Sequence, residues 1–150
     1  MKIAFGCDHG GWPLRDTIID AIHSARHTVV DIGPDSPDSS DYPEFAVAVA
    51  RAVAAGEADL GILACGTGIG MAIAANKIPG AYAANVADPF SARMAREHNG
   101  ANILTMGGRT LGPEVARMLV EAFLSGEVSS QVRHQRRRKK IKAAEREGRE

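Results

Sequence analysis

The sequence predicts an α/β fold, with a five-stranded parallel sheet covered by helices on both faces and a basic helical tail after it. Short apolar runs alternate with longer amphipathic stretches, which is typical of βαβ units. The chain has 150 residues, the size of one domain, and 45% of them are hydrophobic, enough to form a core. We expect one α/β domain over residues 1–132 and a C-terminal extension over residues 133–150.

Five apolar runs predict the strands, which are Lys2–Gly6, Thr28–Ile32, Leu60–Ala64, Ala81–Val86 and Ala101–Met106. The stretches between them predict helices over Pro13–Ala25, Glu44–Ala55, Ile69–Ala75, Pro89–His98 and Pro113–Leu124. Pro13 stands near the start of the first helix, and Gly56 and Gly126 stop the second and the fifth. The segment from Gly33 to Asp41 is a loop by composition, and roughly Arg133–Arg149 is helix-prone and polar.

Composition limits the classes of protein and of partner. No apolar run is long enough to cross a bilayer, and the N-terminus lacks the pattern of a signal peptide. Cys7 and Cys65 are expected to be reduced thiols in a cytoplasmic protein, and two cysteines are too few for a zinc knuckle. We therefore expect no membrane partner and no metal.

The formal net charge of zero conceals an acidic body and a basic tail. Residues 133–150 contain nine Lys/Arg and three Glu, a net charge of +6, so residues 1–132 carry −6. By composition, the run from Arg136 to Lys140 is a solvated tail, and a nucleic-acid patch is the alternative. No aromatic residue is interleaved with it, which argues against nucleic acid as a partner.

Ligands of open α/β sheets bind beyond the carboxyl ends of the strands. The segments at those ends are Gly6–Gly11, Cys65–Gly70, Val86–Pro89 and Gly107–Arg109. Cys65 to Gly70 has glycines at alternate positions, so its backbone can turn tightly and hold an oxyanion or a phosphate. A thiolate beside those amides could abstract a proton. A small buried cysteine in a dinucleotide-binding turn is the commoner interpretation of such a turn alone.

The remaining candidates each have a structural alternative. Asp8 and His9 suit hydroxyl binding, or form an Asx-type turn. His98 is an ordinary helix C-terminus, pointing away from the strand tips. Arg133 and Arg137 share a helix face and, with Arg109, could clamp a phosphate. Tyr42 precedes a helix beside a capping Asp41, and contact with a ligand is its less common role.

Taken together, these segments resemble the B-type ribose-5-phosphate isomerases, relatives of the galactose-6-phosphate and allose-6-phosphate isomerases. The matching pieces, in family order over nearly the whole chain, are Gly6–His9, Asp41–Pro43, Cys65–Gly70, Ala74–Lys77, His98-Asn99, Asn102–Leu104, Gly107–Arg109 and Arg133–Gln135 with Arg137. The resemblance implies a Rossmann-like three-layer α/β/α sandwich. It also implies a homodimer, possibly paired into a tetramer, with active sites shared between subunits.

The resemblance further implies interconversion of ribose 5-phosphate and ribulose 5-phosphate without a cofactor. Cys65 looks like the base, His98 like the acid that opens the sugar ring, and Thr67 with the amides of Gly66, Gly68, Ile69 and Gly70 like the enediolate cradle. Asp8, His9 and Asn99 look like sugar contacts. Arg133 and Arg137 look like the phosphate clamp, with Arg109 donated by the partner subunit. The family's alternative base, a glutamate, aligns with Met71, so this chain matches the cysteine-type subgroup.

Two questions stay open from the sequence. A six-carbon sugar phosphate is an alternative substrate, because pocket depth is not readable from one chain. A non-catalytic phosphate-binding module and a nucleic-acid binder are the alternative functions, and the second would use the basic run from Arg136 to Lys140.

Overall fold

The computed structural model describes residues 1–147 and confirms the predicted α/β fold. The strands are β1 (Lys2–Cys7), β2 (Thr28–Asp31), β3 (Leu60–Cys65), β4 (Ala83–Asn85) and β5 (Ile103–Gly107). The helices are η1 (Trp12–Leu14), α1 (Arg15–Ser24), α2 (Tyr42–Ala54), α3 (Ile69–Ala75), α4 (Pro89–Glu97), α5 (Pro113–Leu124) and α6 (Val132–Glu147). All five strands are parallel and follow the spatial order β2-β1-β3-β5-β4.

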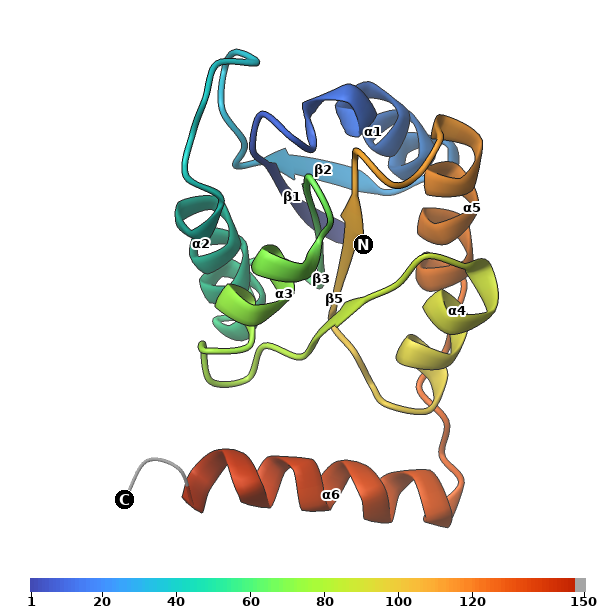
Figure 1. Cartoon of the computed structure of the whole chain (residues 1–150). Helices are drawn as coiled ribbons and strands as arrows, with labels where there is room; N and C mark the ends of the chain where they lie inside the picture. Colours follow the sequence, from blue (N-terminus) through green and yellow to red (C-terminus); the bar gives the residue numbers. More distant parts are fainter. Residues whose placement is uncertain (148–150) are drawn as a thin grey trace.

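Helices cover both faces of the sheet, which makes three layers (Figure 1). One core cluster joins the sheet to α1, α4 and α5 through side chains such as Phe5, Ile18 and Phe123, all fully buried. The second joins the other face to α2 and α3 through Val49, Leu63 and neighbouring small residues. The central strand β3 is buried along its whole length, as its apolar sequence predicted.

The strand order reverses between β1 and β3, because the chain first adds β2 on one side and then continues on the other. Cys7 pairs with Ala64 and Cys65 pairs with Gly107, so the ends of β1, β3 and β5 meet at one edge of the sheet. Such a reversal is where open α/β sheets bind ligands.

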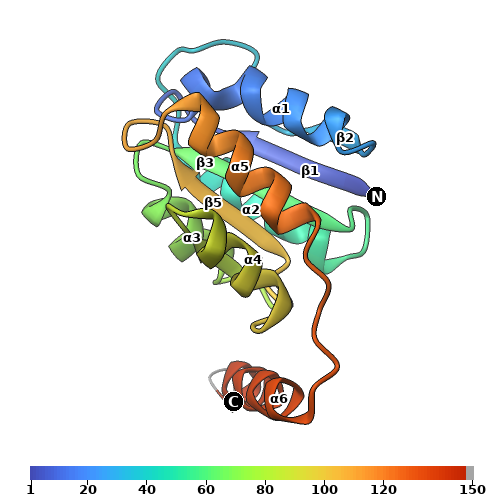
Figure 2. The ribbon, with the colours of Figure 1, turned by 90° about the vertical axis from the view of Figure 1, so that its right-hand side faces the viewer.

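α6 stands apart from the three layers. It lies across the amino ends of the strands, on the edge of the sheet opposite to the loops that follow β1 and β3 (Figures 1 and 2). Its contacts with the domain are polar, and His134 is the one buried residue of the helix within the described chain. α6 is held by specific contacts and not by an apolar face.

Candidate active site

The loops after β1, β3 and β5 pack backbone against backbone. A Cβ on Gly11 would overlap the carbonyl of Ala64, and a Cβ on Gly108 would overlap the carbonyl of Gly10. The N–H of Gly108 donates to the carbonyl of Cys65 at 2.7 Å. Only glycine allows loops to approach this closely, so these glycines bring three strand ends into one site.

The turn after β3 surrounds the sulfur of Cys65. The N–H of Gly68 donates to Sγ at 3.2 Å, and Gly68 has φ of 80°, a left-handed conformation that glycine adopts without strain. Cys65 is 5% exposed, whereas Thr67 and Ile69 are exposed. The N–H of Ile69 lies 3.3 Å from Oγ1 of Thr67. The turn therefore places a thiol, a hydroxyl and backbone amides around one point.

Thr105, which the sequence analysis missed, binds this turn through its hydroxyl. It is fully buried in β5, and its hydroxyl lies 3.0 Å from the carbonyl oxygen of Gly68 and 3.0 Å from Oδ1 of Asn85. A Cβ on Gly68 would overlap the same Asn85 oxygen. Fixing the Gly68 carbonyl fixes the peptide plane that carries the N–H of Ile69. The available signal was a hydroxyl residue in an otherwise apolar strand.

Replacing Thr105 by Val should loosen the turn. We expect Thr105→Val to lower the free energy of unfolding by about 0.5–1.5 kcal/mol, because the Gly68 carbonyl loses one of its two donors and keeps the N–H of Ala72. The alkylation rate of Cys65 should change with it, while Thr105→Ser should keep both values near those of the wild type. Denaturant unfolding and mass spectrometry measure the two quantities. Equal behaviour of the Val and Ser variants would contradict a role for the hydroxyl.

Asp8 and His9 follow β1 and lie beside the turn. Asp8 is buried, and its Oδ1 accepts the N–H groups of Gly10 and Gly11 at 2.8 and 3.0 Å, which is the Asx-type bonding considered above. His9 is half-buried, and its Nδ1 accepts the N–H of Ser40 at 3.2 Å. That bond assigns the proton of neutral His9 to Nε2, which leaves a donor for a ligand.

Tyr42 and Arg109 complete this side of the site. A Cβ on Gly70 would lie 2.6 Å from the ring of Tyr42, and a Cβ on Gly66 would lie 3.3 Å from Nη1 of Arg109. Arg109 is exposed, and its N–H donates to the carbonyl of Gly66 at 3.0 Å. Arg109 therefore lies at the turn of its own chain, and its donation by the partner subunit stays a prediction.

Asp41 also differs from expectation in detail. It occupies the N-cap position of α2, but its side chain makes no capping hydrogen bond. The helix begins at Tyr42, two residues earlier than predicted, with Pro43 in its first turn.

The other predicted site residues lie at the opposite edge of the sheet. His98 and Asn99 follow α4 at the amino end of β5, and Arg133 and Arg137 stand on α6. β5 has five residues at about 3.3 Å each, so roughly 16 Å separates this edge from the Cys65 turn. One chain therefore holds the predicted site residues in two groups, at opposite edges of the sheet.

His98 is held in place by α6. Its ring stacks on that of His134 with 4.1 Å between centroids, and Nη1 of Arg138 donates to its carbonyl at 3.1 Å. Burial lowers the pKa of His134, and the charges of His98 and three neighbouring arginines lower it further. His134 was not singled out in the sequence, and its place beside Arg133 in the matching motif was the available signal.

The two thiols differ in environment, and alkylation should separate them. Burial and the nearby carboxylate of Asp31 raise the pKa of Cys7 to about 12, so its thiolate fraction at pH 8 is on the order of 10⁻⁴. Sγ of Cys65 instead accepts the N–H of Gly68. We expect iodoacetamide to label Cys65 first in the native protein, measured by peptide mass spectrometry. Cys7→Ala should leave the rate at Cys65 unchanged; faster labelling of Cys7 would contradict this assignment.

Residues 1–147 contain no group of three or more His, Cys, Asp or Glu placed to hold a metal ion. Within the same residues, none of the helices combines the length and the apolar character that a membrane span requires.

The fold and the site define an α/β protein with a glycine-rich turn around a thiol at the carboxyl ends of the strands. The Ribose/Galactose Isomerase family model matches residues 3–141. Ribose-5-phosphate isomerase B of Escherichia coli is 46% identical over 144 residues, which cover 96% of each chain. Galactose-6-phosphate isomerase subunit LacB of Clostridium acetobutylicum is 41% identical, over 83% of this chain and 72% of that one.

A solved structure agrees with these matches. Type B ribose 5-phosphate isomerase of Trypanosoma brucei superposes with a TM-score of 0.92 at 50% identity, and the match covers 95% of this chain and 97% of that one. The chain belongs to the ribose/galactose isomerase family, as the sequence motifs predicted, and is a sugar-phosphate isomerase.

Proposed function

We propose that the protein interconverts D-ribose 5-phosphate and D-ribulose 5-phosphate through a cis-enediolate, with Cys65 as the base. The observation that carries this proposal is a thiol that accepts a backbone N–H inside a glycine turn, with Asp8, His9 and Arg109 beside it. The names of the relatives from Escherichia coli and Trypanosoma brucei support ribose 5-phosphate as the substrate.

Cys65 removes the proton from C2 of the open-chain aldose and returns it to C1. Electrons from the C2–H bond form the C1–C2 double bond, and the aldehyde oxygen becomes an enediolate oxygen. The amides of the turn and the hydroxyl of Thr67 stabilise that charge where it develops. The proton of the C2 hydroxyl then moves to the C1 oxygen, so that reprotonation of C1 by Cys65 leaves a carbonyl at C2. Met71 is fully buried and has no acidic group, so Cys65 is the base available in this turn.

His98 would open the furanose ring before this step, by moving a proton between the ring oxygen and the C1 hydroxyl. His98 and Cys65 lie at opposite edges of one chain, so the complete site needs two copies. A two-fold dimer brings the same pair of surfaces together twice and completes two sites. We propose that the Cys65 turn of one subunit faces His98 and Asn99 of its partner. The same interface could recur in a tetramer.

The phosphate would bind where α6 of one subunit meets the His9 loop of the other. Arg133 and Arg137 are four residues apart and share a face of α6. Nε2 of His9 adds a donor from the facing subunit, and Arg109 lies close enough to the turn to add charge. Oδ2 of Asp8 is the atom that we assign to a sugar hydroxyl, because Oδ1 binds two backbone N–H groups.

Removing one arginine of the clamp should weaken binding more than chemistry. We expect Arg137→Ala to raise KM for ribose 5-phosphate by about tenfold or more, as the loss of one charge-assisted phosphate contact predicts, with a smaller change in kcat. Arg136→Ala, on the adjacent exposed position, is the matched control. An unchanged KM in Arg137→Ala would remove Arg137 from the clamp.

A coupled assay that detects ribulose 5-phosphate tests the proposed function directly. Activity that persists with a metal chelator is the expected result. Allose 6-phosphate and galactose 6-phosphate test the six-carbon alternative, which the LacB relative favours. Saturable phosphate binding without turnover of any of these sugars would favour a non-catalytic module.

Both cysteines are free thiols, which supports our further proposal that the enzyme works in the cytoplasm.

A further inference from the structure

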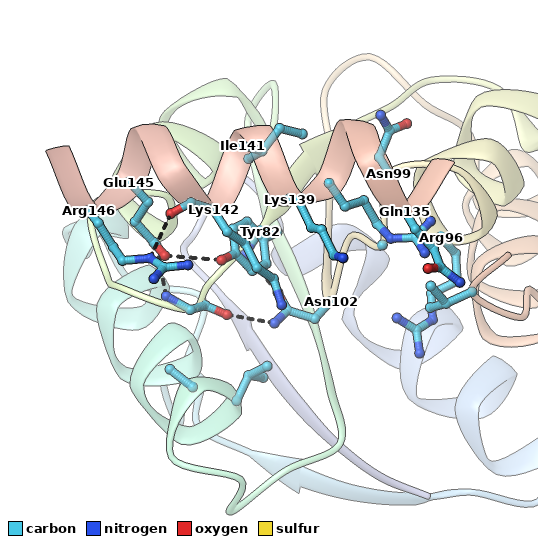
Figure 3. A pocket seen from close by; sticks show the side chains of 16 residues that line it. Tyr82, Arg96, Asn99, Asn102, Gln135, Lys139, Ile141, Lys142, Glu145 and Arg146 are labelled. Atoms are coloured by element: carbon cyan, nitrogen blue, oxygen red, sulfur yellow. Dashed lines mark hydrogen bonds between the residues drawn. The ribbon is translucent and has the colours of Figure 1, made fainter. Parts of the chain in front are cut away.

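A cleft of about 680 Å³ lies between α6 and the amino edge of the sheet (Figure 3). Contacts hold α6 over it at both ends. His134 stacks on His98 at one end, and at the other Glu145 accepts the N–H of Gly80 and the hydroxyl of Tyr82 at 2.9 and 3.0 Å. The cleft is thus defined by specific contacts, and its volume is typical of small-molecule sites.

The lining of this cleft is strongly cationic. Its five cations are Arg96, Arg138, Lys139, Lys142 and Arg146. Among the described lining residues Glu145 is the one carboxylate, and it already binds Gly80 and Tyr82. The three salt bridges found within residues 1–147 include none of the five cations. The cleft therefore concentrates positive charge without an acidic side chain to balance each cation.

Arg96 shows the imbalance most directly. It projects from α4 toward the cleft, half-buried, and Nη1 donates to the carbonyl of Ala101 at 3.2 Å. Its Nε is buried and has no hydrogen-bond partner within the described chain. Burial also lowers the pKa of Arg96. A desolvated guanidinium without a counter-charge is destabilised, and an anion bound in the cleft would supply that counter-charge.

We infer that this cleft binds an anion carrying two or more phosphate groups. Five cations against one engaged carboxylate leave an excess of four positive charges, which matches a polyphosphate or a bisphosphate better than a single phosphate. Because Arg96 belongs to α4 and the other cations to α6, the anion would join the helix to the domain.

This site differs from the proposed phosphate clamp on the same helix. Arg133 and Arg137 lie about 40° apart around α6, whereas Lys142 comes five residues after Arg137 and lies about 140° further round. Arg138, Lys139 and Lys142 line the cleft, and neither Arg133 nor Arg137 does. The two faces of α6 can therefore bind different anions at once.

Isothermal titration calorimetry of the full chain with inorganic tripolyphosphate tests the inference. We expect saturable binding that weakens at least tenfold in Lys139→Gln/Lys142→Gln. Arg136→Gln/Lys140→Gln removes the same charge from exposed positions of α6 outside this cleft and should change the affinity less than twofold. An equal loss in both double variants would show diffuse attraction to a basic helix and overturn the site. Absence of tripolyphosphate binding to the wild type would also overturn the inference. That result is expected if a partner subunit fills the cleft.

Two further measurements identify the class of ligand and test whether the cleft binds it independently of the active site. Titrations with adenosine triphosphate and with a sugar bisphosphate distinguish a nucleotide from a sugar ligand. Binding of either compound supports a site for two or more phosphate groups. Saturating ribose 5-phosphate should leave tripolyphosphate binding unchanged. Displacement would place the anion in the phosphate clamp and overturn a separate cleft site. These measurements do not depend on turnover, so a failure of the proposed isomerase activity would be seen separately.

Discussion

Cys65→Ser should lose about 10³-fold or more in kcat while keeping the fold. A serine hydroxyl is a far weaker base than a thiolate, and positioned proton transfer contributes about 10²–10⁴-fold to a reaction rate. The hydroxyl can still accept the N–H of Gly68, so the left-handed turn keeps its support. The coupled isomerase assay measures the loss, and thermal unfolding verifies the fold.

Cys7→Ser is the matched control, because it makes the same chemical change at the other buried thiol. Cys7 is fully buried in β1, so that variant should lose stability and keep its specific activity once folded. Near-normal turnover of Cys65→Ser would contradict the assignment of the base. An equal loss in both variants would show a fold defect instead.

His98→Asn should abolish most turnover of ribose 5-phosphate but spare an open-chain substrate. Asparagine cannot exchange a proton as imidazole does, so ring opening loses its catalyst while Cys65 remains intact. We expect a loss of about 10²-fold for the ring-forming sugar, and a much smaller loss for a four-carbon aldose phosphate, which cannot close the same ring. Steady-state kinetics on both substrates give the comparison.

His134→Asn controls for the stacking of the two imidazoles. It removes the ring that lies 4.1 Å from His98 and leaves the proposed acid in place. Its effect should be similar on both substrates, because Arg138 still holds His98 and the change acts through the docking of α6, which carries the proposed phosphate clamp. An equal loss on ring-forming and open-chain substrates in His98→Asn would contradict the ring-opening role.

The order of elements could be predicted from the sequence, because apolar periodicity and helix boundaries are local signals. β4 shows that local signals do not determine every strand boundary. Ala81–Val86 was predicted, but the strand covers only Ala83–Asn85. The N–H of Tyr82 binds Oδ1 of Asn102 instead of joining the ladder, and the side chain of Asn76 binds both the N–H and the carbonyl of Ala83. Side chains distant in sequence shorten this edge strand.

The convergence of the loops around Cys65 could be predicted, because glycine turns after parallel strands meet at one edge of the sheet. Its support by Thr105 could not, since that hydroxyl reaches the Gly68 carbonyl across 37 positions of the chain. From the sequence, His98 was expected at the end of a crossover helix, which points away from the strand tips. That position conflicts with a role beside Cys65 in the same chain. The structure confirms that placement and adds α6 beside it through the stack with His134.

Mixing two inactive variants tests the shared site most directly. Cys65→Ser and His98→Asn would each be purified, unfolded together and refolded at equal concentrations, so that half of the dimers contain one chain of each kind. In such a dimer one site carries both substitutions and the other carries neither. We predict recovery of about one quarter of wild-type activity, as random pairing in a two-fold dimer requires. If Cys65 and His98 act within one chain, the mixture stays as inactive as its components, and that result would contradict the account.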